Sequence, residues 1–178
     1  MGEPNPVISI FASVAGEHYV AYRLSIMGYL VARTRGHYWP RATLMVGHMA
    51  GHAAATLQVN TSIGACRRHG NKSSGENHWR WEMGERHYMP DGHSFCYAFV
   101  DLKYPCPLDP PEQIPDVFIV PAQHIADQLS DPNCLAHDVF VIKEQDSSKY
   151  FEAWHHITDH IGIGLPKTGP TVAPPSSD

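Results

Sequence analysis

The apolar residues of this chain fall mainly in short runs that are separated by residues typical of turns. Each run holds between four and eight residues, which favours β-strands over buried helices. The runs cover residues 29–32, 42–46, 54–59, 95–102, 117–120 and 139–142. A chain with this pattern folds around a β-sheet, and the runs at 42–46 and 54–59 are close enough to form a hairpin.

Two longer segments have the spacing of amphipathic helices. Residues 14–27 place apolar side chains at helical intervals, and Gly28 follows them as a natural C-cap. Residues 149–160 predict a second helix, and a third is predicted to open near Pro121, since proline suits a first helical turn. The apolar face of the helix at 149–160 consists of Tyr150, Trp154 and Ile157. This order predicts a mixed α/β fold with helices packed on a central sheet.

The length of 178 residues predicts a single domain with flanking segments. We assign residues 1–12 to an N-terminal extension, residues 13–161 to the domain, and the Gly-, Pro- and Ser-rich residues 162–178 to a disordered tail. Residues 67–77 are polar and Gly-rich, and residues 104–115 carry five prolines, so both are predicted to be loops.

The charge and composition of the chain limit which kinds of partner it can bind and in which compartment we expect it. The chain has 13 Lys and Arg against 18 Asp and Glu, a net charge of −5, which excludes a globally basic nucleic-acid binder but leaves room for a local basic face. No apolar run approaches the roughly 18 residues of a membrane span, and no basic leader is present, so we expect a cytoplasmic protein. We expect its four cysteines, which lack zinc-site spacing, to be reduced thiols: Cys66, Cys96, Cys106 and Cys134.

Three sequence motifs occur in a fixed order along the chain. The first is GEHYVA at 16–21 with GYLVA at 28–32, and the second is PRATLMV at 40–46 with LQVNT at 57–61. The third is FCYAFVDL at 95–102 with PDVFIVP at 115–121. Together they resemble the PD-(D/E)XK nucleases, in the branch of small bacterial nuclease-like domains. The resemblance implies a restriction-endonuclease-like fold, a single α/β domain with a central mixed β-sheet flanked by helices.

The resemblance also implies a metal site on the hairpin, and here the chain departs from the family. Glu17 and Gln58 match the family's helix Glu and strand Glu or Gln, but Thr43 stands where the metal-binding Asp belongs and Asn60 where the Lys belongs. A neutral hydroxyl binds Mg²⁺ poorly, and a neutral amide cannot offset phosphate charge. We therefore expect a vestigial site without a cofactor, and Mg²⁺ only if nuclease activity survives. An equally weighted alternative is that Glu17 and Gln58 are ordinary helix and strand residues and not remnants of a site.

A second acidic arrangement competes with the hairpin site. Pro90-Asp91 precedes Asp101-Leu102-Lys103 by about ten residues and spells PD…DxK, so Asp91 and Asp101 are the alternative metal ligands. Asp91 would stand in the turn leading into the strand of Asp101, which is poor geometry for a shared ion. Pro115-Asp116 follows in the reverse order and is discounted.

Basic residues and aromatics offer candidate nucleic-acid contacts. Arg33, Arg35 and Arg41 lie near the expected cleft, and Arg67, Arg68 and Lys72 lie in the loop that follows the hairpin. The alternative is that all six are simply solvated. Trp79 and Trp81 are expected to pack on one sheet face as core, and most of the 13 histidines to be surface residues.

The preferred function is a catalytically degenerate nuclease-like protein that associates with nucleic acid or with a protein. The alternatives are an active Mg²⁺-dependent endonuclease with a relocated or partner-completed site, and a structural or inhibitory protein-binding domain. The sequence leaves the oligomeric state open.

Overall fold

The computed structural model describes residues 6–34, 43–51, 53–69, 76–83, 95–103, 114–130 and 139–161. The helices in these segments are α1 Pro6–Ile26, α2 Ala122–Ser130, α3 Glu144–Ser147 and α4 His155–Ile161. The strands are β1 Leu30–Arg33, β2 Leu44–Gly47, β3 Ala54–Ser62, β4 Cys66–His69, β5 Glu76–Glu82, β6 Phe95–Asp101, β7 Asp116–Pro121 and β8 Val139–Lys143.

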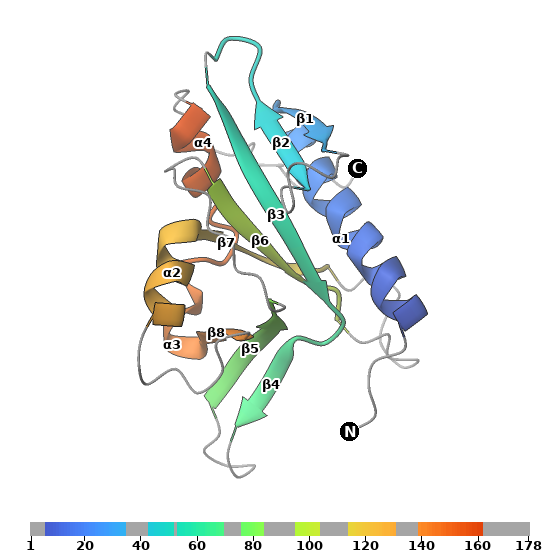
Figure 1. Cartoon of the computed structure of the whole chain (residues 1–178), viewed down its shortest axis with the longest axis vertical. Helices are drawn as coiled ribbons and strands as arrows, with labels where there is room; N and C mark the ends of the chain where they lie inside the picture. Colours follow the sequence, from blue (N-terminus) through green and yellow to red (C-terminus); the bar gives the residue numbers. More distant parts are fainter. Residues whose placement is uncertain are drawn as a thin grey trace, which may run out of the picture.

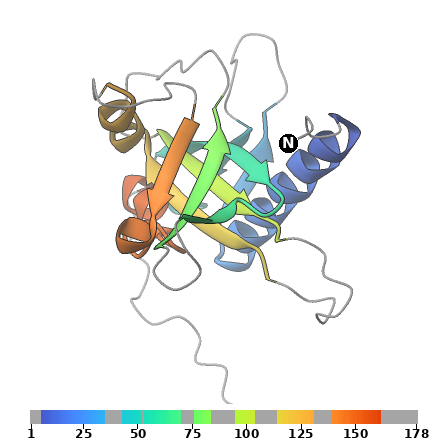
Figure 2. The ribbon, with the colours of Figure 1, turned by 90° about the horizontal axis from the view of Figure 1, so that it is seen from below.

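The strands form a five-stranded sheet with the order β1-β2-β3-β6-β7 and a three-stranded sheet with the order β4-β5-β8. In the larger sheet β1, β2 and β3 are antiparallel, β6 runs parallel to β3, and β7 is antiparallel to β6. Helices α1 and α4 pack on one face of this sheet, and α2 and the smaller sheet pack on the other (Figures 1 and 2). The mixed α/β fold with a central mixed sheet flanked by helices confirms the predicted class, including the β2–β3 hairpin.

Strand β6 is buried on both faces and divides the interior into two cores. Its small residues Ala98 and Val100 face α1 and α4, where Leu57 and Trp154 complete the first core. Its aromatic residues face the smaller sheet, where rings pack closely: Tyr97, Phe99, Phe118, Trp81 and Phe140. The predicted core roles are confirmed for Trp81 and Trp154, and Trp79 packs against the second core.

Helix α1 begins at Pro6, eight residues before the predicted start at Val14. The prediction was wrong because four of the residues 7–11 carry large apolar side chains that are exposed (Val7, Ile8, Ile10 and Phe11), so no amphipathic periodicity marks this part of the helix. The helix is continuous across residues 12 and 13, where the sequence placed a domain boundary. Its C-terminal end agrees with the prediction, since Gly28 adopts a φ of +90°.

Two further predictions are corrected. The expected loop at 67–77 contains most of β4 and the start of β5, which pair with each other as antiparallel strands although the local sequence is polar. The expected helix at 149–160 begins only at His155. Phe151 instead pairs with Phe118, and Glu152 has a φ of +50°, so the chain turns sharply before α4. Tyr150 consequently joins the second core, while Trp154 joins the first.

The cysteines that the structure describes are free thiols. Burial raises the pKa of Cys96 to about 12, and burial together with the Asp101 carboxylate raises the pKa of Cys66. Both thiols stay protonated at neutral pH. Cys106, Cys134 and the tail at 162–178 lie outside the described residues. Within the described segments, no helix combines the length and hydropathy that crossing a bilayer requires.

Helix α1 packs closely against β3 at Gly16. A Cβ atom at Gly16 would lie 2.8 Å from Thr61 Cγ2 and 2.9 Å from Thr61 Cβ, and closer still to Thr61 Oγ1. We expect Gly16→Ala to lower the free energy of unfolding by about 1–3 kcal/mol, because the helix must shift away from the sheet. Urea denaturation of Gly16→Ala, beside Ser25→Ala on the exposed side of the helix, measures this. An increase in stability, as for an ordinary helical Gly→Ala, would contradict the close packing.

Candidate functional site

The predicted hairpin positions do meet in the structure. Thr43 directly precedes β2, and its backbone N–H donates to Leu57 O at 2.8 Å, which places it beside Gln58 of β3. The Thr43 hydroxyl accepts a hydrogen bond from Val59 N at 2.8 Å and donates to Leu57 O at 3.4 Å. Both contacts are to the backbone of β3. The hydroxyl therefore acts as part of the strand pairing, and its geometry is set by the sheet.

Gln58 and Asn60 lie two residues apart on β3 and share the face directed toward the smaller sheet. Gln58 Nε2 donates to Asn60 Oδ1 at 3.3 Å, and Asn60 Nδ2 contacts Met83 Sδ at 3.7 Å. Gln58 Oε1 is buried without a hydrogen-bond partner among the described residues. The two amides are thus turned toward each other and toward a thioether, an arrangement without formal charge.

Glu17 forms an ion pair on α1, which packs on the sheet face opposite to that of Gln58 and Asn60. Its Oε2 accepts a hydrogen bond at 2.6 Å from the guanidinium of Arg33, the last residue of β1. The Glu17 side chain is only 13% exposed. The one carboxylate among the four predicted positions is therefore neutralised by a neighbouring cation, and Arg33 is correspondingly occupied.

A divalent cation needs several oxygen ligands, at least some of them anionic. The hairpin offers one hydroxyl and two amides, none of them formally charged, and of their oxygens only Gln58 Oε1 has no hydrogen-bond partner among the described residues. Among the described residues, no group of three or more His, Cys, Asp and Glu side chains could hold a metal ion. Thr43, Gln58 and Asn60 thus bring no formal charge to the hairpin.

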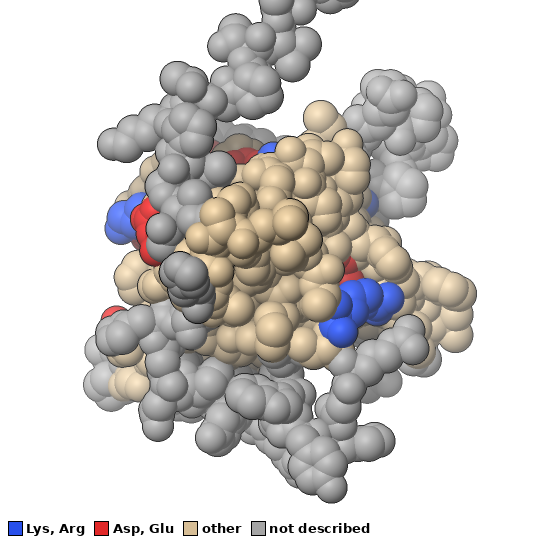
Figure 3. Space-filling view, turned by 90° about the horizontal axis from the view of Figure 1, so that it is seen from above, with Lys and Arg blue, Asp and Glu red and all other residues tan. Residues whose placement is uncertain are grey.

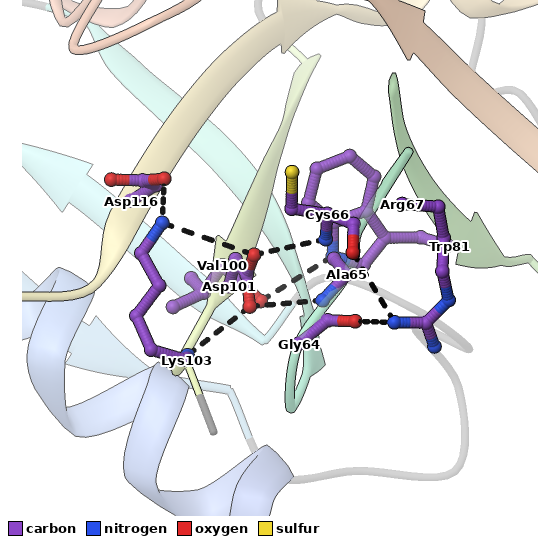
Figure 4. Close-up of polar contacts among 9 residues, drawn as sticks. All are labelled: Gly64, Ala65, Cys66, Arg67, Trp81, Val100, Asp101, Lys103 and Asp116. Atoms are coloured by element: carbon purple, nitrogen blue, oxygen red, sulfur yellow. Dashed lines mark hydrogen bonds and ion pairs between the residues drawn. The ribbon is translucent and has the colours of Figure 1, made fainter. Parts of the chain in front are cut away.

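Asp101 takes a structural position that the sequence did not reveal. Its side chain is fully buried at the end of β6, and the carboxylate accepts hydrogen bonds from Ala65 N at 2.9 Å and Cys66 N at 3.1 Å (Figure 4). It also accepts from Lys103 N at 3.1 Å, where the backbone has a φ of +59°. The Asp101 carboxylate therefore links the start of β4 to the turn after β6 through hydrogen bonds to both.

The same cluster contains a residue pair that the sequence order had discounted. Lys103 Nζ forms an ion pair with Asp116 and lies 4.0 Å from Asp101 Oδ2, because β6 and β7 place Asp101 opposite Asp116 (Figure 4). Pro115-Asp116 and Asp101-Leu102-Lys103 thus meet in space as a literal PD and DxK. The lysine ammonium sits between the two carboxylates, and the backbone N–H groups occupy both oxygens of Asp101. Asp91, its predicted partner, lies outside the described residues.

The predicted basic residues have mixed outcomes. Arg35, Arg41 and Lys72 lie outside the described residues, and Arg68 is placed only as a backbone position in β4. Arg67 is exposed, and its guanidinium donates to the carbonyls of Gly64 and, at 3.3 Å, Cys66. Figure 3 shows few charged side chains among the described residues on the face seen from above, where blue atoms stand beside red ones.

A basic row of which the sequence analysis named only Arg67 lies at the opposite end of the molecule. The strand pairing aligns Arg67 of β4, His78 of β5 and Lys143 of β8 across the smaller sheet, and Arg80 follows on β5. Trp79 and Trp81 face the core, so these residues face outward on the side that Figure 2 views from below. Glu76 and Glu82 occupy β5 positions of the same parity as His78 and Arg80, so this face includes acidic positions as well. The alternation of Trp79, Arg80 and Trp81 in the sequence indicates that β5 has an inner and an outer face. Only the strand pairing shows that Lys143 belongs to the outer face.

Comparisons with known proteins place the chain in no established family. No family model matches the sequence, and no curated protein matches it. A solved structure titled as a bacterial homing endonuclease, I-Ssp6803I, is similar over 85% of this chain and 92% of its own, with 14% sequence identity and a TM-score of 0.46.

Proposed function

We propose that the chain is a catalytically inactive relative of the PD-(D/E)XK nucleases that associates with nucleic acid without cutting it. The observation that supports the loss of catalysis is the set of hydrogen bonds made by Thr43 and Asn60. Thr43 supports the backbone of β3, and Asn60 bonds to Gln58 and Met83, at the two positions where the family has an anionic ligand and a cation. The proposal requires no Mg²⁺ and, with free thiols, fits a cytoplasmic location.

The association with nucleic acid is assigned to the outward face of the β4–β5–β8 sheet, called here the basic face and defined by Arg67, His78, Arg80 and Lys143. Elsewhere in the described chain, cations are bound to carboxylates: Arg23 to Glu152, Arg33 to Glu17, Lys103 to Asp116 and Lys149 to Asp146. Within the same described segments, no carboxylate forms an ion pair with Arg80 or Lys143, and both side chains are exposed. Such side chains gain most from phosphate, since binding releases counterions.

Anisotropy titrations of labelled single- and double-stranded DNA, without divalent ions, test this assignment. For wild type we expect affinity to fall steeply with salt. Arg80→Gln/Lys143→Gln should reduce the slope of log affinity against log salt by about 2, since each phosphate contact contributes close to one unit of slope. Lys149→Gln, which removes an exposed cation already paired with Asp146, is the matched control. Absence of binding at low salt would favour the structural or inhibitory protein-binding alternative.

The Asp101–Lys103–Asp116 cluster is the observation that favours the second candidate, an active endonuclease with a relocated site. Asp116 is the informative residue because 23% of its side chain is accessible and, among the described residues, no backbone N–H binds it as three bind Asp101. Mg²⁺-dependent cleavage by wild type that Asp116→Asn abolishes would support the relocated site. Three backbone hydrogen bonds fill most of the lone-pair positions of the Asp101 carboxylate, which makes the inactive state the stronger proposal.

A further inference from the structure

The outward side of α1 is apolar along the length of the helix. At intervals of three or four residues it presents a set that we call the outer stripe: Val7, Phe11, Val14, His18, Tyr22 and Ile26. The apolar and aromatic members are 41–69% exposed, and His18 is exposed as well. A surface helix normally turns its polar residues to this side, so the pattern is the reverse of the usual one.

The outer stripe is separate from the face by which α1 packs on the domain. Ala12, Val20 and Leu24 are buried on the opposite side. The two charged residues of the helix, Glu17 and Arg23, are drawn to the body by ion pairs with Arg33 and Glu152. The outer stripe consequently carries no formal charge when His18 is neutral. Apolar residues cover both sides of the helix, and the side with Val20 and Leu24 is the one that packs into the core of the domain.

The exposed area is larger than a monomer normally leaves open. Together with the adjoining Ile8, the outer stripe exposes on the order of 600 Å², at the upper limit of the largest apolar patches on monomers. A standard interface takes about 800 Å² from each partner, so the outer stripe supplies most of one side. The three- and four-residue spacing is the one by which helices interdigitate with other helices.

We propose that the outer stripe is the interface of a homodimer in which α1 packs antiparallel against α1 of a second copy. The stripe is nearly symmetric about its middle. A two-fold axis between Val14 and His18 pairs Val7 with Ile26 and Phe11 with Tyr22, so the same surface serves both copies, as an isologous interface requires. Two neutral stripes meet without like-charge repulsion, and the antiparallel helices also oppose their dipoles favourably.

The chemistry of the helix favours a second copy over other occupants. A helix that lies on a lipid surface has Lys and Arg beside its apolar face, whereas the only cation of α1, Arg23, is bound to Glu152. Nucleic acid would require cations on the stripe itself. This inference does not depend on the basic face. The basic face lies on the β4–β5–β8 sheet, whereas the outer stripe lies on α1, so either proposal can fail without the other.

Sedimentation velocity of the full chain over a wide concentration range tests the proposal. Wild type should sediment as a reversible dimer, and Phe11→Glu should raise the dissociation constant by at least about thirtyfold, since each copy would bury a carboxylate against apolar side chains. Phe11 is 69% exposed, so the substitution should leave folding intact, which a thermal melt confirms. Phe11→Leu and Met49→Glu are the matched controls, the first keeping the apolar stripe and the second placing a carboxylate at a residue that is 87% exposed and outside it.

Dimeric wild type, Phe11→Leu and Met49→Glu beside monomeric Phe11→Glu would establish the interface. Monomeric wild type at every concentration would overturn the proposal, whether or not the protein then binds lipid vesicles or another protein. A Phe11→Glu variant that remains fully dimeric would also overturn it, because the interface would then lie elsewhere.

Discussion

Asp101→Ala is expected to lower the free energy of unfolding by about 3–5 kcal/mol. The substitution removes the acceptor of three backbone N–H groups, those of Ala65, Cys66 and Lys103. Buried donors left without a partner carry the full cost of desolvation, and hydrogen bonds to a charged acceptor are the stronger kind. The start of β4 and the left-handed turn at Lys103 would lose their common anchor. Urea denaturation monitored by tryptophan fluorescence measures the change, since Trp81 packs nearby and donates to Val100 O.

Asp116→Ala is the control for Asp101→Ala. It removes a carboxylate from the same cluster, but one that is partly exposed and, within the described segments, pairs with Lys103 alone, so its cost should be about 1 kcal/mol or less. Equal and small effects of the two substitutions would contradict the structural role of Asp101. Its carboxylate would then be a realistic metal ligand, and the relocated nuclease site would gain support.

Thr43→Asp/Asn60→Lys is expected to create a divalent-ion site on the hairpin. Thr43 and Gln58 stand side by side, and Asn60 shares the face of Gln58, so the double variant would combine an anionic ligand with a neighbouring cation. Saturating Mn²⁺ or Mg²⁺ should raise the melting temperature of the double variant by about 5–10 °C and leave wild type unchanged. An aspartate at position 43 can still accept the hydrogen bond of Val59 N, so the hairpin should survive.

The control for this gain is Thr43→Asn/Asn60→Gln, which alters both side chains without adding charge. It should show no metal-dependent shift, because neutral oxygens hold these ions weakly. A shift of equal size in wild type would mean that the native side chains already bind the ion. That result would remove the main support for a vestigial site.

The sequence predicted the parts of this fold that depend on local periodicity. The β2–β3 hairpin follows from two short apolar runs with a Gly-rich connection, and its pairing brings Thr43, Gln58 and Asn60 together as expected. The end of α1 follows from Gly28. The inward direction of Trp81 follows from alternation along β5.

The remaining features depend on contacts between residues that are distant in the sequence. Asp101 resembles a polar strand end until Ala65 and Cys66, some 35 residues earlier, are placed against it. Asp116 contacts Lys103 because β6 pairs with β7. In the sequence Pro115-Asp116 follows Asp101-Leu102-Lys103, the reverse of the family's order, so the sequence order did not suggest this contact. The break before α4 depends on the turn at Glu152, whose carboxylate binds Arg23 of α1. No local pattern contains these contacts.

Incubating supercoiled plasmid with wild-type protein in Mg²⁺ or Mn²⁺, beside Thr43→Asp/Asn60→Lys, tests the inactive state most directly. The account predicts that wild type binds the plasmid at low salt without nicking it, while the double variant nicks it in a metal-dependent way. If wild type nicks the plasmid in a metal-dependent way, and this nicking activity co-purifies with the protein, the account is contradicted.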